Sequence, residues 1–153
     1  MDRARGKPAS TKKETGGRSY RLEDQVGHLL RRAHQRATAI FQQRIGADIT
    51  PTQFAALARL RDAGAVSQNH LGRLAAMDPA TTQGVVRRLR QRALIAARPD
   101  PDDRRRSRLT LTRRGRALID RLLPNGFDVS AAILEPLSPR ERVTFLAMLK
   151  RLG

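Results

Sequence analysis

Residues 94–111 of the chain read LIAARPDPDDRRRSRLTL. Residues 94–98 and 107–111 are runs of the strand-forming type, and residues 99–106 between them are turn-forming and highly charged. This order of strand, charged turn and strand predicts a β-hairpin. The segments on both sides place apolar residues at three- and four-residue steps, which is the spacing of a helix. We therefore predict a mainly α fold that carries one small β-hairpin.

Two short helices are predicted directly before the hairpin. Ser67 is placed to cap the first, and Asp78 followed by Pro79 is a cap-plus-proline signal that opens the second. Only a few residues around Met77 join them. The side chains expected to be buried in these two helices are Leu71, Leu74, Ala75, Val85, Val86 and Leu89. Two capped helices joined by so short a turn are typical of a helix-turn-helix.

The first helix is predicted over about residues 21–44, and it has two neighbouring apolar stripes. One stripe consists of Leu22, Val26, Leu29, Ala33, Ala37 and Ile40, and the other of Leu30, His34, Phe41 and Ile45. A helix that is apolar over two stripes has more surface to bury than one small domain needs. This surplus favours a dimer interface.

Three further helix starts can be recognised. Residues 50–53 read TPTQ, which combines an N-cap, a first-turn proline and a capping box, and this helix is expected to end near residues 62–64. Thr112 is expected to cap a helix that the PNG of residues 124–126 interrupts, with a short segment over residues 127–134 after it. The SPRE of residues 138–141 is a second capping box and begins the last helix.

The charge of the chain is strongly positive and unevenly distributed. Thirty-one Lys and Arg stand against fourteen Asp and Glu, a net charge of +17. Residues 78–116 hold twelve arginines and four aspartates, a net charge of +8, whereas residues 117–153 carry only +1. A basic field of this kind indicates a polyanionic partner, and its concentration on one part of the fold is expected of a nucleic-acid footprint.

Several classes of site and of location are disfavoured. The chain has no cysteine, so disulfides, thiolate metal sites and thiol-based redox sensing are excluded. Its histidines, His28, His34 and His70, have no metal-type spacing, and we expect no metal or cofactor. We see no apolar run of transmembrane length and no signal-peptide core, and residues 1–18 read as a disordered basic tail. A cytoplasmic protein with no membrane partner is expected.

Enzymatic motifs are not found in the sequence. It contains no Gly-rich phosphate loop, no nucleophile–base pair and no carboxylate cluster outside the Asp-rich hairpin. We therefore predict that the protein is not an enzyme.

The motifs together resemble the MarR family of transcriptional regulators. Residues 100–115, DPDDRRRSRLTLTRRG, match the family's wing, an Asp-x-Arg tip followed by an apolar-x-Leu-Thr-x-x-Gly tail. Residues 50–60 resemble its Thr-x-x-Gln-x-x-x-Leu-x-x-Leu second helix, and residues 137–142 resemble the start of its last helix. The similarity covers roughly residues 20–152. It implies a winged helix-turn-helix protein.

The resemblance also implies a domain organisation and a function. Residues 19–153 would form one MarR-type domain, in which residues 19–48 and 117–153 are dimerisation helices and residues 49–116 are the DNA-binding lobe. Two chains would intertwine as a homodimer, with their lobes in adjacent major grooves of a pseudo-palindromic operator in double-stranded DNA. Family regulators usually repress transcription, and many release DNA when a small, often aromatic and anionic ligand binds. A ligand-responsive repressor, associated with the bacterial nucleoid, is expected.

The residues expected to contact DNA lie on the second helix of the helix-turn-helix and on the wing. Gln83 can contact adenine, while Thr81 or Thr82 can meet a phosphate or a thymine methyl group. The resemblance places Arg105 in the minor groove, with Asp103 as the carboxylate that holds it. The whole expected set is Asp78, Thr81, Thr82, Gln83, Arg87, Arg88, Asp103, Arg104, Arg105 and Arg106. A solvated helix face and an ordinary charged turn are the alternatives.

Gly84 departs from the family pattern, since many members carry a basic residue at this place. Glycine removes a base or phosphate contact and lowers helix propensity by roughly 1 kcal/mol. Arg87 or Arg88 would then replace the missing charge.

A ligand cavity is expected between the first helix and the DNA-binding lobe, with His28, Arg32, His34 and Phe54 in its walls. Basic groups beside apolar ones suit a small aromatic acid of the nicotinate or salicylate type. Residues 24–36 resemble family members that control nicotinate breakdown. His34 also fits a core or interface histidine on the stripe of Leu30 and Phe41, which is the commoner case.

Two other functions stay open from the residues alone. A constitutive architectural DNA-binding protein, without ligand response, would have the same charge and the same wing. An RNA-binding protein would also explain the charge, but a wing with a minor-groove arginine disfavours it because the grooves of RNA have other shapes.

Overall fold

The computed structural model describes residues 19–46, 48–103, 105 and 107–153. The expected basic tail, residues 1–18, lies outside the described residues, as do Arg104 and Arg106. The elements, in chain order, are η1 (Leu22–Asp24), α1 (Val26–Ile45), α2 (Pro51–Ala63), α3 (Gln68–Leu74), α4 (Pro79–Gln91), β1 (Ile95–Pro99), β2 (Ser107–Leu111), α5 (Arg113–Leu134) and α6 (Pro139–Leu152). The predicted fold class, mainly α with one hairpin, is confirmed.

The helix starts that were predicted from capping residues are confirmed in detail. In the capping box of α2, the Thr50 hydroxyl accepts from the Gln53 amide and the Gln53 side chain accepts from the Thr50 amide, both at 3.2 Å. Ser138 and Glu141 form the same box at the start of α6. Ser67 caps α3 and Thr112 caps α5. Each cap binds backbone N–H groups that have no partner within the helix, which is why these boundaries can be predicted from sequence.

The lobe around the helix-turn-helix has a closed apolar core. Its fully buried large side chains are Leu57, Leu60, Leu71, Val85, Leu89, Leu94 and Ile119. The hairpin joins this core because β2 pairs with β1 on one side and bridges to Val66 on the other. The Val66 and Leu109 backbones exchange two hydrogen bonds, of 3.1 and 2.7 Å. The wing is therefore attached firmly to the helices.

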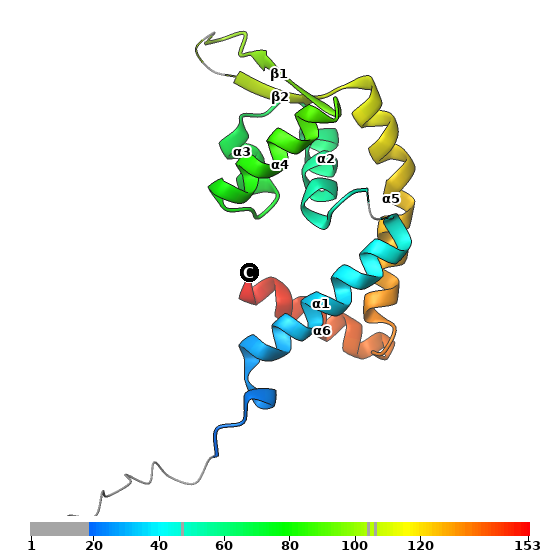
Figure 1. Ribbon diagram of the computed structural model, residues 1–153. Coiled ribbons are helices and arrows are strands. Elements are labelled where there is room, and N and C mark those ends of the chain that lie inside the picture. The colour runs from blue at the N-terminus through cyan, green and yellow to red at the C-terminus, as the bar shows by residue number, and fades with distance from the viewer. Residues whose placement is uncertain (1–18, 47, 104, 106) are drawn as a thin grey trace, which may run out of the picture.

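Helix α5 links the two ends of the molecule. It begins beside the hairpin and runs down to the level of α1 and α6 (Figure 1), packing against α1, α2 and β2 along the way. Gly115 allows the close start, since a Cβ there would lie 1.9 Å from the carbonyl oxygen of Leu94. No helix among the described residues has the length and hydropathy needed to cross a membrane.

The expected interruption of α5 at residues 124–126 is wrong, because the helix continues from Arg113 to Leu134 through Pro124. Proline removes one backbone hydrogen bond but does not end a helix that tertiary contacts hold on both sides. Asn125 donates its side-chain amide to the Arg44 carbonyl at 3.1 Å. A Cβ on Gly126 would meet the Phe54 ring at 3.0 Å. These residues, which suggest a turn, allow close packing instead.

The first helix also begins later than expected. Residues 22–24 form a short 3₁₀ turn, Gln25 is extended, and α1 starts at Val26 without a side-chain cap. The apolar spacing continues across this break, so periodicity alone could not locate it.

Candidate nucleic-acid interface and ligand site

Helix α4 presents one polar face to solvent. Val85, Val86 and Leu89 are buried, as predicted, and Gln83 and Arg87 on the other side are exposed. A groove of about 720 Å³ runs along this face. It is lined by Gln68, Ala80, Gln83, Gly84, Val86, Arg87, Arg90 and Gln91. The lining is rich in amide and guanidinium groups, which can bind base edges and phosphates.

Asp78 fixes the first turn of α4. Its carboxylate accepts from the Thr81 amide at 2.9 Å and from the Thr81 hydroxyl at 2.5 Å. The hydroxyl contact, followed by the amide contact, lowers the pKa of Asp78 below its usual range. Asp78 is therefore ionised at neutral pH and serves as the N-cap. It orients Thr81, whose half-buried side chain lies at the N-terminal end of the exposed face.

The expected DNA contact by Thr82 is wrong. Its side chain is only 3% exposed, and its hydroxyl donates to the Asp78 carbonyl at 2.8 Å. It faces α3, where a Cβ on Gly72 would lie 2.7 Å from the Thr82 hydroxyl oxygen. Thr82 therefore packs α4 onto α3 and does not present its hydroxyl to solvent. The two adjacent threonines differ because Thr82 lies on the same face of α4 as the buried Val85, Val86 and Leu89, whereas Thr81 does not.

Gly84 lies in the middle of the exposed face, and the Arg88 side chain extends over it. A Cβ on Gly84 would be 3.6 Å from an Nη atom of Arg88. The Cα atom of Arg88 lies about one turn after Gly84 along α4, at the edge of the exposed face. Of the two candidates for the charge missing at Gly84, Arg88 is therefore the one whose guanidinium lies beside it.

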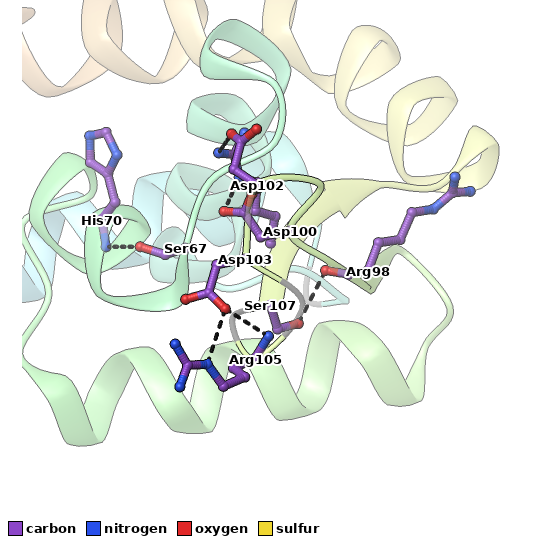
Figure 2. Close-up of polar contacts among 9 residues, drawn as sticks. Ser67, His70, Arg98, Asp100, Asp102, Asp103, Arg105 and Ser107 are labelled. Atoms are coloured by element: carbon purple, nitrogen blue, oxygen red, sulfur yellow. Dashed lines mark hydrogen bonds and ion pairs between the residues drawn. The ribbon is translucent and has the colours of Figure 1, made fainter.

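The wing brings Asp103 and Arg105 together. The Asp103 carboxylate accepts from the Arg105 amide at 3.1 Å and from its guanidinium Nε at 3.4 Å (Figure 2). The side chain of Arg105 is 93% exposed, while that of Asp103 is 33% exposed. The contact that the family resemblance implied is present. It leaves the guanidinium accessible at the tip of the hairpin.

A second carboxylate stabilises the turn of the wing, and sequence reasoning missed it. Asp100 accepts from the Arg108 guanidinium at 2.6 Å. It also accepts from the Asp102 amide at 3.0 Å (Figure 2). The Asp100 side chain is 12% exposed and that of Arg108 is 37% exposed, so only the carboxylate of this ion pair is largely shielded from water. The signal in the sequence was the Asp-x-Asp of residues 100–102, since an aspartate often accepts from the amide two residues on.

The four expected ligand residues do not come together within one protomer. Phe54 packs edge-on against Phe41, with ring centroids 5.6 Å apart. His34 lies two turns before Phe41 on the same face of α1 and is exposed. His28 and Arg32 lie roughly 120° and 160° around the helix from His34, since successive residues are about 100° apart. His28 is half-buried and Arg32 is exposed.

Two polar contacts join the lobe to the segments before and after it in the chain, and neither was predicted. The Arg61 guanidinium on α2 contacts Asp120 on α5 at 2.5 Å, which raises the pKa of Arg61. Arg92, just after α4, donates to the backbone carbonyl of Asp48. Residues 61 and 120 are 59 positions apart. No local pattern in the sequence could have paired them.

Comparison with known proteins agrees with this architecture. Residues 47–106 match the model of the MarR family. The HTH-type transcriptional repressor NicR of Pseudomonas putida is 43% identical, over 87% of this chain and 85% of that protein.

Solved structures give the same result. A probable transcriptional regulator from Pseudomonas aeruginosa superimposes with a TM-score of 0.83 and 47% identity, over 87% of this chain and 100% of that one. A structure of Bordetella bronchiseptica BpsR concerns the regulation of its DNA binding by 6-hydroxynicotinic acid. It superimposes with a TM-score of 0.83 and 43% identity, over 88% of this chain and 96% of that one. The resemblance inferred from the wing is confirmed: this chain belongs to the MarR family of transcriptional regulators.

Proposed function

We propose that the protein is a homodimeric repressor that binds a pseudo-palindromic operator in double-stranded DNA and releases it when a small aromatic carboxylic acid binds. The observation that carries this proposal is the pairing of two basic surfaces on one lobe. The polar face of α4 is exposed along its length, and beside it Asp103 holds the accessible Arg105 at the tip of the wing. This arrangement suits a helix in the major groove and an arginine in the minor groove.

The dimer is proposed from the far end of the molecule. Leu22, Val26, Leu29 and Leu30 are exposed near the start of α1, and α6, which the structure describes over its whole length, buries none of its residues. Two such ends would cover each other. The two lobes would then meet half-sites one helical turn, about 34–36 Å, apart. Residues 19–48 and 117–153 would be the dimerisation helices and residues 49–116 the DNA-binding lobe.

The proposed roles of the single residues follow from their geometry. Gln83 and Arg87 would contact base edges, Arg88 would supply the cation beside Gly84, and Thr81 would meet a phosphate at the start of α4. Asp78 and Asp103 would position Thr81 and Arg105 rather than touch DNA, because a carboxylate repels phosphate. Arg104 and Arg106 are proposed as phosphate contacts from the sequence alone.

The effector is proposed to be a nicotinate-type acid, with a salicylate-type acid as the second choice. The DNA binding of BpsR is regulated by 6-hydroxynicotinic acid, and this chain is 43% identical to BpsR. Because one protomer does not bring His28, Arg32 and His34 together, we propose that residues of both protomers complete the site in the dimer. An aromatic ring would lie on the apolar wall near Phe54, and arginine or histidine would bind the carboxylate.

A mobility-shift titration on the protein's own promoter tests the proposal. We expect operator binding that weakens steeply as salt is added. A plot of log K against the logarithm of the salt concentration should have a slope of about −0.9 for each phosphate neutralised. We also expect release by nicotinate, 6-hydroxynicotinate or salicylate. For each tenfold loss of operator affinity, the ligand must bind the form that does not bind DNA more tightly than the DNA-binding form by about 1.4 kcal/mol.

Two variants test the effector site in the same titration. Arg32→Ala and His34→Ala should remove the release while leaving operator binding intact. Specific binding that no aromatic acid weakens would contradict ligand release and favour the architectural alternative. Binding that does not depend on salt would contradict the DNA footprint itself.

A further inference from the structure

A second cavity, of about 440 Å³, lies where the lobe meets the end of α1 and the first half of α5. Its walls are Ile45, Gly46, Asp48, Ile49, Arg92, Leu94, Arg114, Ala117, Leu118, Arg121 and Leu122. None of these belongs to the ligand residues expected on α1 and α2. The volume is within the usual range for small-molecule sites.

The wall formed by α5 combines charge with free space. Arg114, Ala117 and Arg121 follow each other at three- and four-residue steps, so they share one face of the helix. The two arginines are roughly 10 Å apart along the helix axis, since each residue adds about 1.5 Å. The small side chain of Ala117 between them leaves room for a ligand. Leu118 and Leu122, beside this stripe, add apolar surface.

The opposite wall is apolar and carries a third arginine. Ile49 and Leu94 are buried, and they line the cavity from the lobe side. Arg92 donates to the backbone carbonyl of Asp48, which positions its guanidinium at this wall. The cavity thus has three guanidinium groups and one carboxylate, that of Asp48, for a net charge of +2.

The charges of the two α5 arginines are available to a ligand. Within the part of the chain that the structure describes, neither Arg114 nor Arg121 forms an ion pair. Asp120, the carboxylate nearest to them on α5, is engaged by Arg61. A small anion in the cavity could therefore take a charge-assisted hydrogen bond from either arginine without breaking an existing ion pair.

We propose that this cavity is a second ligand site, which takes a small carboxylic acid with an apolar body, such as an aromatic acid. The carboxylate would bind Arg114 or Arg121, and the body would lie on Ile49, Leu118 and Leu122. An occupant would touch Arg92 and Leu94 of the lobe as well as α1 and α5. It would therefore favour one orientation of the lobe over others, and this last step alone rests on the proposed function.

Methyl NMR of the full-length protein, titrated with benzoate, tests the site. The ring current of benzoate should shift the methyl resonances of Ile45, Ile49 and Leu118. Arg121→Gln should weaken this binding at least tenfold, and Ala117→Leu should abolish the shifts by filling the cavity without a change of charge. Arg116→Gln is the matched control, because it removes the same charge from an exposed position of α5 outside the cavity.

Three results of this titration would overturn the proposal. If Arg121→Gln and Arg116→Gln weaken benzoate equally, the effect is general electrostatics and the proposal fails. It also fails if the three methyl groups do not respond, or if inorganic phosphate shifts them as strongly as benzoate, because the apolar wall then contributes nothing. A mobility-shift assay with 6-hydroxynicotinate reports on the operator independently. The methyl titration therefore decides the cavity even if the wild-type protein never releases DNA.

Discussion

Apolar residues are mostly buried at one end of the molecule, in the lobe, and mostly exposed at the other end, in α6. In the lobe, the leucines of α2, α3 and α4 are largely buried, and the β2 strand of the hairpin is bridged to Val66, between α2 and α3. In α6, all of which the structure describes, no residue is buried, and Val143, Leu146, Met148 and Leu152 are exposed. Apolar surface of this extent is stable in water only when something covers it. The lobe thus covers its apolar residues within one chain, whereas α6 leaves its own exposed, as we expect of a surface that a second chain covers.

The largest effect is expected from Leu146→Asp, which puts a charge on the uncovered face of α6. Leu146 is 43% exposed in the single chain, so the variant should fold as a monomer. Operator affinity should fall at least a hundredfold, because two linked half-site contacts become two separate ones. Light scattering and a mobility-shift assay measure the two effects. Arg151→Gln, with the same change of charge on the same helix, should stay dimeric, and a dimeric Leu146→Asp protein would contradict the comparison.

The next effect concerns the closed lobe. Gly115→Ala would place a Cβ 1.9 Å from the Leu94 carbonyl oxygen, which belongs to the backbone and cannot rotate away. Helix α5 must then move off the lobe, and we expect a loss of about 3 kcal/mol in the free energy of unfolding. Urea denaturation measures it. A loss below about 1 kcal/mol in the free energy of unfolding would mean that α5 can shift away from the lobe at little cost.

The wing and α4 should differ in what they read. Arg105→Ala should reduce operator affinity by about 1–3 kcal/mol and flatten the preference for A·T-rich flanks. Gln83→Ala should instead relax the preference at one base pair in each half-site. Anisotropy titrations against single-base variants of the operator measure both. Equal losses on every sequence would show that neither side chain reads DNA.

The smallest effect is a gain. Gly84→Ala adds a Cβ whose nearest neighbour, an Nη atom of Arg88, is 3.6 Å away, an ordinary contact. Unlike Gly115, Gly84 therefore tolerates alanine, and the higher helix propensity should stabilise the lobe by about 1 kcal/mol. Thermal unfolding measures the gain. Gly84→Lys should displace the Arg88 guanidinium and alter the base preference of the protein. Gly84→Ala should leave the base preference unchanged.

Much of the fold could be predicted because its signals are local. The capping boxes at Thr50 and Ser138, the cap at Asp78 and the charged turn of the hairpin involve residues close to each other in the chain. The contact of Asp103 with Arg105 is also local, so the motif alone could identify it. Side chains this close in sequence meet in almost any fold that forms the element.

The failures have the opposite character. Residues 124–126 suggest a turn, but contacts with Arg44 and Phe54, which lie far away in the sequence, keep them helical. Thr82 has the same polarity as Thr81, and only the approach of α3 buries it. The pairing of Arg61 with Asp120 depends on how α2 packs against α5.

The sequence by itself determined most of the elements, the family and the excess of apolar surface on the first helix. Each of these depends on short spacing or on total composition. Only the tertiary structure decided that Thr82 is buried on α4, that Arg88 lies over Gly84, and that a basic cavity opens between α5 and the lobe. Those properties depend on distances between segments far apart in the chain, and such distances are set by packing, which no local pattern encodes.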